Sequence, residues 1–99
     1  MNFIPFNSIY PNIYNSSWVA QNATVIGNVI LGKESSLWHG VILRGDIIPI
    51  KIGEKSVIHD LTILKSNDFN LGKISIGDNV VIGPNCTIDS CEIENNSFI

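Results

Sequence analysis

An aliphatic residue recurs every six positions through most of this 99-residue chain. Written in sixes from Val19, the chain reads VAQNAT, VIGNVI, LGKESS, LWHGVI and LRGDII. After three further residues the frame resumes at Ile52 with IGEKSV and IHDLTI, and after an interruption at 65–75 it resumes at Ile76 with IGDNVV, IGPNCT, IDSCE and IENNSF. Each block opens with Val, Leu or Ile, its second position is often Gly, and the next two are mostly polar.

This period predicts an all-β, single-stranded parallel β-helix. Short strands place alternate side chains inward, while Gly, Asn and Asp allow the corners between them. Three strands make one triangular coil of about 18 residues, and successive coils pair in parallel. We expect an N-terminal arm over 1–18 and the β-helix over 19–99, without a C-terminal capping helix. A β-sandwich or barrel is the alternative, but its turn signals would recur about every 8–12 residues.

The position before each aliphatic anchor is expected to face outward. A solvated face would carry more Thr, Lys or Glu, so an aliphatic stripe there predicts contact with another chain. The alternative is scattered surface isoleucine, selected for its β propensity. We expect Ile42, Ile63 and Val81 to form the stripe. The full outward set is Ile30, Ile42, Ile48, Val57, Ile63 and Val81.

Composition narrows the possible partners. Hydrophobic residues make up 44% of the chain and charged residues 15%, with a net charge of −3, so it has no basic cluster for nucleic acid. No apolar run is long enough to span a membrane. Residues 1–14 lack the pattern of a targeting peptide and are interpreted as a folded arm. Two cysteines do not make a disulfide framework.

The segment 26–46, IGNVILGKESSLWHGVILRGD, resembles the γ-class carbonic anhydrases. Members of that family carry a block close to SSIWxxxVLRGD, matched here by Ser35 to Asp46, and the likeness continues through IKIGEKSVIHD and IGDNVVIG. The resemblance implies a left-handed β-helix and a trimer of homologous chains. It also implies a zinc or iron ion between subunits, bound by three histidines that two chains supply.

All three of those histidines are replaced in this chain. The positions that match the family's ligand motifs hold Lys65, Pro84 and Asp89. Catalytic zinc needs three protein ligands and an open position for water. Proline offers no side-chain donor, and a lysine ammonium repels a dication. We therefore expect no cofactor, no metal ligand and no catalytic residue.

Four other residues could rebuild a metal site, although simpler interpretations exist. His39 is expected at a surface corner, and His59 replaces a near-site glutamine of the family. His59 with Asp89 is conceivable as a substituted site. Cys86 and Cys91 are expected to pack in the core, and they lack a recognisable zinc spacing with histidine.

The surviving matches favour assembly over catalysis. Arg44 and Asp46 match residues that form ion pairs at the family's subunit interface, and Asp60 matches another polar residue of its motifs. A solvated corner pair is the alternative for Arg44 and Asp46.

The resemblance therefore predicts a non-catalytic structural subunit of a homo- or heterotrimer. Such trimers occur on mitochondrial respiratory complex I, and a cytoplasmic location is the alternative. A carbonic anhydrase with a shared or rebuilt metal site and a hexapeptide-repeat acyltransferase are the alternative functions.

Overall fold

The computed structural model describes residues 2–66, 72–89 and 91–99. Within these ranges the chain forms short strands and no helix, and every ladder between strands is parallel. The strands are β1 (Asn2–Ile4), β2 (Asn12–Ile13), β3 (Trp18–Val19), β4 (Thr24–Leu31), β5 (Ser36–Leu37), β6 (Ile42–Ile52), β7 (Val57–Ile58), β8 (Ile63–Lys65), β9 (Ile74–Ile76), β10 (Val81–Ile82), β11 (Thr87–Asp89) and β12 (Glu92–Ile93).

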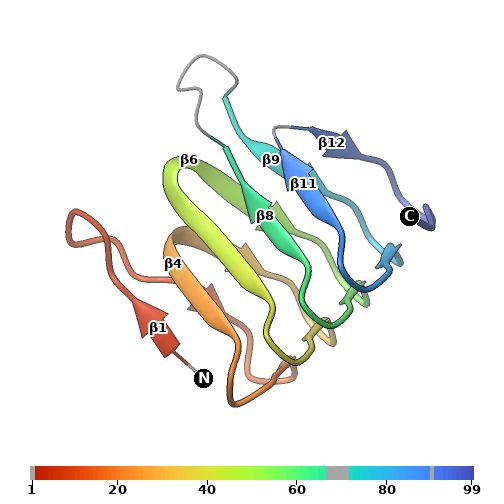
Figure 1. Cartoon of the computed structure of the whole chain (residues 1–99), viewed down its shortest axis with the longest axis horizontal. Coiled ribbons are helices and arrows are strands. Elements are labelled where there is room, and N and C mark those ends of the chain that lie inside the picture. Colours follow the sequence, from red (N-terminus) through yellow and green to blue (C-terminus); the bar gives the residue numbers. More distant parts are fainter. Residues whose placement is uncertain (1, 67–71, 90) are drawn as a thin grey trace.

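The strands line three faces of a stacked β-solenoid, with the β1 end and the β12 end at opposite ends of the stack (Figure 1). We call face A the ladder of β1, the first halves of β4 and β6, β8 and β11. Face B consists of β2, the second halves of β4 and β6, β9 and β12. Face C is the separate sheet of β3, β5, β7 and β10. The parallel β-helix that the six-residue period predicts is confirmed.

The core is a stack of aliphatic side chains from successive coils. Leu43 of β6 and Leu64 of β8 lie in register on face A, and both are fully buried. Leu37 and Ile58 do the same on face C. Because each layer covers its neighbours, burial of these side chains is the main stabilising term of the solenoid.

Residues 2–19 pair strand by strand with the coil that follows them. Strand β1 pairs with the start of β4, β2 with the end of β4, and β3 with β5. The stretch that the sequence predicts as an N-terminal arm therefore extends the three faces of the solenoid. The six-residue period is weak in this stretch, so the sequence did not reveal the coil.

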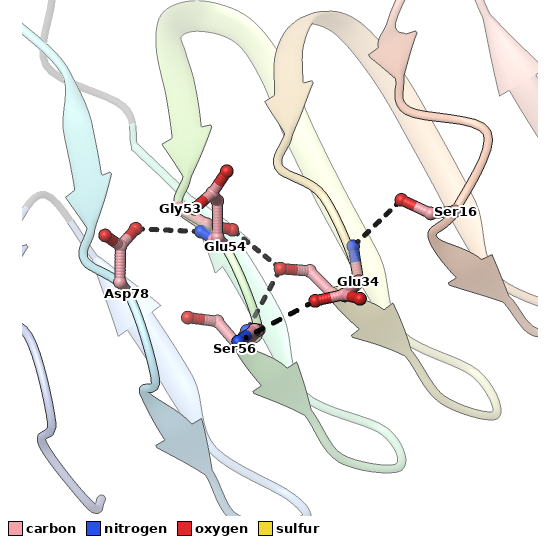
Figure 2. Close-up of polar contacts among 8 residues, drawn as sticks. Ser16, Glu34, Gly53, Glu54, Ser56 and Asp78 are labelled. Atoms are coloured by element: carbon pink, nitrogen blue, oxygen red, sulfur yellow. Dashed lines mark hydrogen bonds and ion pairs between the residues drawn. The ribbon is translucent and has the colours of Figure 1, made fainter.

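Buried hydroxyl groups tie the coils together at the corner between faces B and C, which we call the serine corner. Ser35 Oγ donates to Gly53 O at 2.6 Å and accepts the Ser56 N–H at 3.0 Å. Figure 2 shows Gly53 and Ser56 at this corner. Ser56, one coil further, makes the equivalent two bonds, since its Oγ donates to Gly77 O and accepts the Val80 N–H. Each hydroxyl thus serves two backbone groups that the corner would otherwise leave unpaired.

One predicted outward position, Ile48, and the predicted place of Val81 in the stripe are wrong, and both errors come from inserted residues. Ile48 is buried because β6 contains a register shift. Asp46 and Ile47 both lie outside the core, so the inward–outward alternation is interrupted there and Ile48 points inward. Val81 pairs with Val57 on face C, not with Ile63 on face A. The residue beside Ile63 is Thr87, because 24 residues rather than about 18 separate these two strands.

Candidate functional site

Two of the three positions that match metal ligands lie side by side on face A. Lys65 at the end of β8 and Asp89 at the end of β11 are register partners. Lys65 Nζ lies 3.4 Å from Asp89 Oδ2, and 28% and 51% of the two side chains is exposed. The lysine thus supplies a cation beside the carboxylate, where the family would have two histidines converging on a metal ion.

The third position, Pro84, is exposed in the turn that follows Gly83. This turn belongs to the edge between faces C and A, which we call the tryptophan edge and define as residues 38–41, 59–62 and 83–86. Proline has no side-chain donor, and an ammonium cannot ligate a metal ion while it is protonated. Among the described residues of this one chain, no three His, Cys, Asp or Glu side chains lie together. Because Pro84 has no side-chain donor and the Lys65 ammonium repels a dication, the residues present do not fit the zinc or iron of the family.

The two histidines considered for a rebuilt metal site are not brought together around Asp89. His59 follows β7 of face C, and its ring lies 6.0 Å from that of Trp38. Asp89 belongs to face A and pairs with Lys65. His39 is exposed at the tryptophan edge, as expected for a corner histidine.

The cysteines pack as expected. Cys86 and Cys91 are free thiols that are partly buried against the aliphatic core. Burial raises the pKa of the Cys91 thiol, and the nearby Asp89 carboxylate raises it further.

Arg44 and Asp46 form an ion pair on the outer side of β6. Arg44 Nη2 lies 2.9 Å from Asp46 Oδ2, while Asp46 Oδ1 accepts the Ile47 N–H. Burial alone would raise the pKa of Asp46, but the Arg44 guanidinium and the backbone N–H groups outweigh it and lower the pKa below 3.8. Leu43 and Leu64 are register partners on face A, and Arg44 and Lys65 are the residues that directly follow them. Both ion pairs therefore lie on face A.

The other expected interface residues are divided among the surfaces. Ile42 and Ile63 are half-buried register partners on face A. Asp60 lies in the tryptophan edge, where its Oδ1 accepts the His39 N–H at 3.2 Å. Val81 is half-buried on face C. The expected stripe is therefore an Ile42–Ile63 pair with a threonine on either side.

An aromatic cluster, which the sequence did not reveal, occupies face C and the tryptophan edge. The ring centroids of Trp18 and Trp38 are 4.8 Å apart, and those of Trp38 and His39 are 6.2 Å apart. Trp18 is 47% exposed and Trp38 36% exposed. The sequence did carry a signal for this cluster, because Trp38 and His59 each directly follow the inward residue of a face C strand. That equivalence becomes visible only when the coils are aligned with their inserted residues taken into account.

Among the described residues, no helix is long and apolar enough to cross a membrane.

Comparison with known proteins identifies related chains over nearly the whole sequence. No family model matches the chain. It is 39% identical over 93 residues to gamma carbonic anhydrase 2, mitochondrial, of Arabidopsis thaliana, a match that covers 90% of this chain and 34% of that protein. It is 41% identical to an uncharacterised protein of Dictyostelium discoideum, over 95% of this chain and 39% of that one.

A solved structure shares both fold and sequence with the chain. The crystal structure of a hexapeptide transferase family protein from Anaplasma phagocytophilum superposes with a TM-score of 0.91 at 34% identity, covering 98% of this chain and 55% of that one. The chain thus spans between about a third and about half of the length of the proteins it matches.

Proposed function

Because the chain belongs to the γ-carbonic anhydrase-like family of hexapeptide-repeat proteins, we propose that it is a non-catalytic structural subunit of a trimer of homologous chains. The observation that carries this proposal is the Lys65–Asp89 ion pair, which occupies two of the positions where the family binds metal. Pro84 removes the third donor.

The chemistry of CO2 hydration supports the non-catalytic assignment. A catalytic zinc ion lowers the pKa of its bound water to about 7 and so supplies hydroxide at neutral pH. Without three ligands there is no such ion, and no described group of this chain replaces it. The Lys65 ammonium repels a dication and has no lone pair to offer it while protonated.

The partners that fit this proposal are homologous chains that retain the ligands. By the resemblance, each metal site takes ligands from two neighbouring subunits, so this chain would disable both sites to which it contributes. A mixed trimer with two competent chains would then hold a single metal ion. The mitochondrial gamma carbonic anhydrase of Arabidopsis supports a mitochondrial location. Membership of respiratory complex I rests on the family resemblance alone, and a cytoplasmic location is the alternative.

The test is metal content together with CO2 hydration, measured on the purified chain. We expect less than stoichiometric zinc or iron after dialysis and no hydration above the uncatalysed rate. The matched control is the triple variant Lys65→His, Pro84→His, Asp89→His, which should gain metal binding if the subunits assemble as the family does. Stoichiometric metal in the unmodified chain, with activity lost on chelation, would contradict the proposal.

A transferase function is the second candidate, supported by the name of the Anaplasma relative. Hexapeptide acyltransferases commonly use a histidine, and His39 and His59 are the two available. Calorimetric titration with acetyl-CoA separates the candidates. Saturable binding that is lost in a His59→Ala variant would favour the transferase over the structural subunit.

A further inference from the structure

The charges of this chain are distributed unevenly along the solenoid. Residues 1–32 contain no Asp, Glu, Lys, Arg or His, and Lys33 is the first residue with a charged side chain. Strands β1, β2 and β3, with the residues that connect them, form one end of the stack (Figure 1). We call this end, residues 2–19, the N-terminal layer. The opposite end carries the exposed residues Glu92 and Glu94.

The N-terminal layer is apolar as well as uncharged. Its exposed large apolar side chains are Phe3, Ile4, Phe6, Ile9, Tyr10, Tyr14 and Trp18. Tyr10 is 68% exposed and Phe3 39% exposed. Single exposed apolar residues are ordinary on a protein surface, but a group of this size within one layer is typical of a surface that contacts another molecule.

The three strands of the layer also leave one edge unpaired. Within the described residues, β1 and β2 pair only with β4, and β3 pairs only with β5. The N–H groups of Trp18 and Ala20 donate toward β5, so the backbone groups of Val19 between them point away from the solenoid. By the same alternation, the backbone groups of Phe3 and Ile13 point away from β4. Such free donors and acceptors are a template for a further strand.

The residues that direct their backbone groups outward are also the ones whose side chains cover the core at this end. They lie in register with the buried residues Val25, Leu31 and Leu37 of the next coil. Exposed edge strands are usually protected by charged side chains or by proline, and β1, β2 and β3 contain neither. A further layer stacked on this end would therefore extend the core and pair the free edge together.

The absence of charge indicates which partner fits this end. A two-fold axis brings the same patch of two copies together, so charged side chains in the patch would meet like charges. The N-terminal layer has none, whereas two copies joined at the opposite end would bring Glu92 and Glu94 of each toward those of the other. Lipid fits less well, because hydrocarbon offers no partner to the free N–H and C=O groups of the edge. The layer is therefore suited to contact with its own copy.

We infer that two copies of the chain stack through their N-terminal layers, with two-fold symmetry and with their strand edges facing each other. The contact goes beyond the proposed trimer, because it lies at the end of the solenoid rather than along its faces. In a closed ring of parallel solenoids the N-terminal layers all lie on one side, so two trimers stack into a hexamer.

Sedimentation across a concentration series tests the stacking on the full chain. We expect the unmodified chain to double its mass reversibly, from trimer to hexamer. Phe3→Glu should weaken this doubling step about tenfold or more, because it buries a charge without a partner. Phe98→Glu, at the opposite end and 81% exposed, is the matched control and should double normally. Far-UV circular dichroism checks that each variant is folded, and Tyr10→Glu, at a more exposed position, replaces Phe3→Glu if that variant does not fold.

A charge swap identifies the surface that the layer meets. Phe3→Glu and Phe3→Lys chains should each stack weakly alone, and their equimolar mixture should double again with a salt-sensitive affinity, because opposite charges then face each other. A mixture that does not double, or a Phe98→Glu chain as impaired as Phe3→Glu, overturns the inference. Binding to phosphatidylcholine vesicles that Phe3→Glu abolishes, without doubling of the unmodified chain, overturns it in favour of a membrane surface.

The same measurements separate the stacking from the proposed trimer. Trimers that never form hexamers overturn the stacking and leave the trimer in place. Doubling from one chain to two, without any species of three chains, supports the stacking and overturns the trimer of identical copies. A chain that stays monomeric at all concentrations overturns both, while the metal measurements still test the non-catalytic assignment separately.

Discussion

The serine corner and the tryptophan edge solve the same structural problem in different ways. At the serine corner, Ser35 and Ser56 seal the turn by bonding to the backbone of the next coil. At the tryptophan edge, the corresponding inward positions hold Val41 and Thr62, of which Thr62 donates in this manner, to Gly83 O at 2.7 Å.

The two corners differ in what they contribute, because the serine corner stabilises the fold and the tryptophan edge presents an apolar surface. The serine corner carries charged and polar residues on its outer side, such as Glu34 and Lys55, whose side chains are about equally exposed at 60% and 63%. The tryptophan edge carries Trp38 and Leu61 at the equivalent surface. One corner holds the coils together within the chain, and the other offers apolar area to a neighbour.

The largest effect is expected at the glycine of the serine corner. In Gly53→Ala the new Cβ would lie 2.7 Å from Gly77 O, a backbone atom held by the next coil. We expect a loss of about 2–4 kcal/mol in the free energy of unfolding, measured by urea denaturation. Gly83→Ala, at the tryptophan edge, is the control. Its Cβ would lie 3.1 Å from Ile99 O, so equal losses in the two variants would contradict the difference between the corners.

Removing one buried hydroxyl comes next. Ser56→Ala leaves Gly77 O and the Val80 N–H without the partner that now lies at 2.7 Å and 3.0 Å. We expect a loss of about 2 kcal/mol, since two buried backbone groups lose a bond. Ser16→Ala is the control, because its exposed hydroxyl accepts the Glu34 N–H at 3.2 Å. A Ser56 variant no weaker than this control would show that the column of hydroxyls does not stabilise the fold.

At the tryptophan edge a substitution should stabilise the isolated chain. Leu61 has a φ of 62°, in the left-handed region that Asn adopts more readily. We expect Leu61→Asn to raise the free energy of unfolding by about 0.5–1 kcal/mol and to weaken association in sedimentation experiments. A variant that is stabilised but associates normally would remove Leu61 from the interface.

The smallest effect concerns the acid sensitivity of the Arg44–Asp46 pair. The folded-state pKa of Asp46 lies below its ordinary value of 3.8, so its contribution to stability is full above that value and declines as the pH falls through the folded pKa. The pair is partly exposed, so we expect Asp46→Asn to cost less than about 1 kcal/mol at pH 7. The difference between variant and unmodified chain should shrink below about pH 4, as followed by thermal unfolding. If the stability difference between Asp46→Asn and the unmodified chain stays constant from pH 7 to pH 3, it does not arise from the ionised Asp46 carboxylate.

Much of the fold followed from residue identity alone. The six-residue period predicted the parallel coils, and it correctly assigned Leu43, Leu64 and Ile82 to the core, because a strand's inward positions are set by local alternation. The mismatch with the family's metal ligands was also visible in the sequence, since whether a side chain can donate to a metal ion depends on its chemistry alone.

Only the tertiary structure decided which outward residues are neighbours. Successive rungs of face C are 18, 21 and 24 residues apart, from Trp18 to Ser36, Val57 and Val81. A side chain's neighbour in the next coil depends on how many residues the intervening turns hold and on how the backbone closes around them. For this reason Val81 was placed on the wrong face, Ile48 was assigned outward, and the pairing of Lys65 with Asp89 became apparent only in the folded chain.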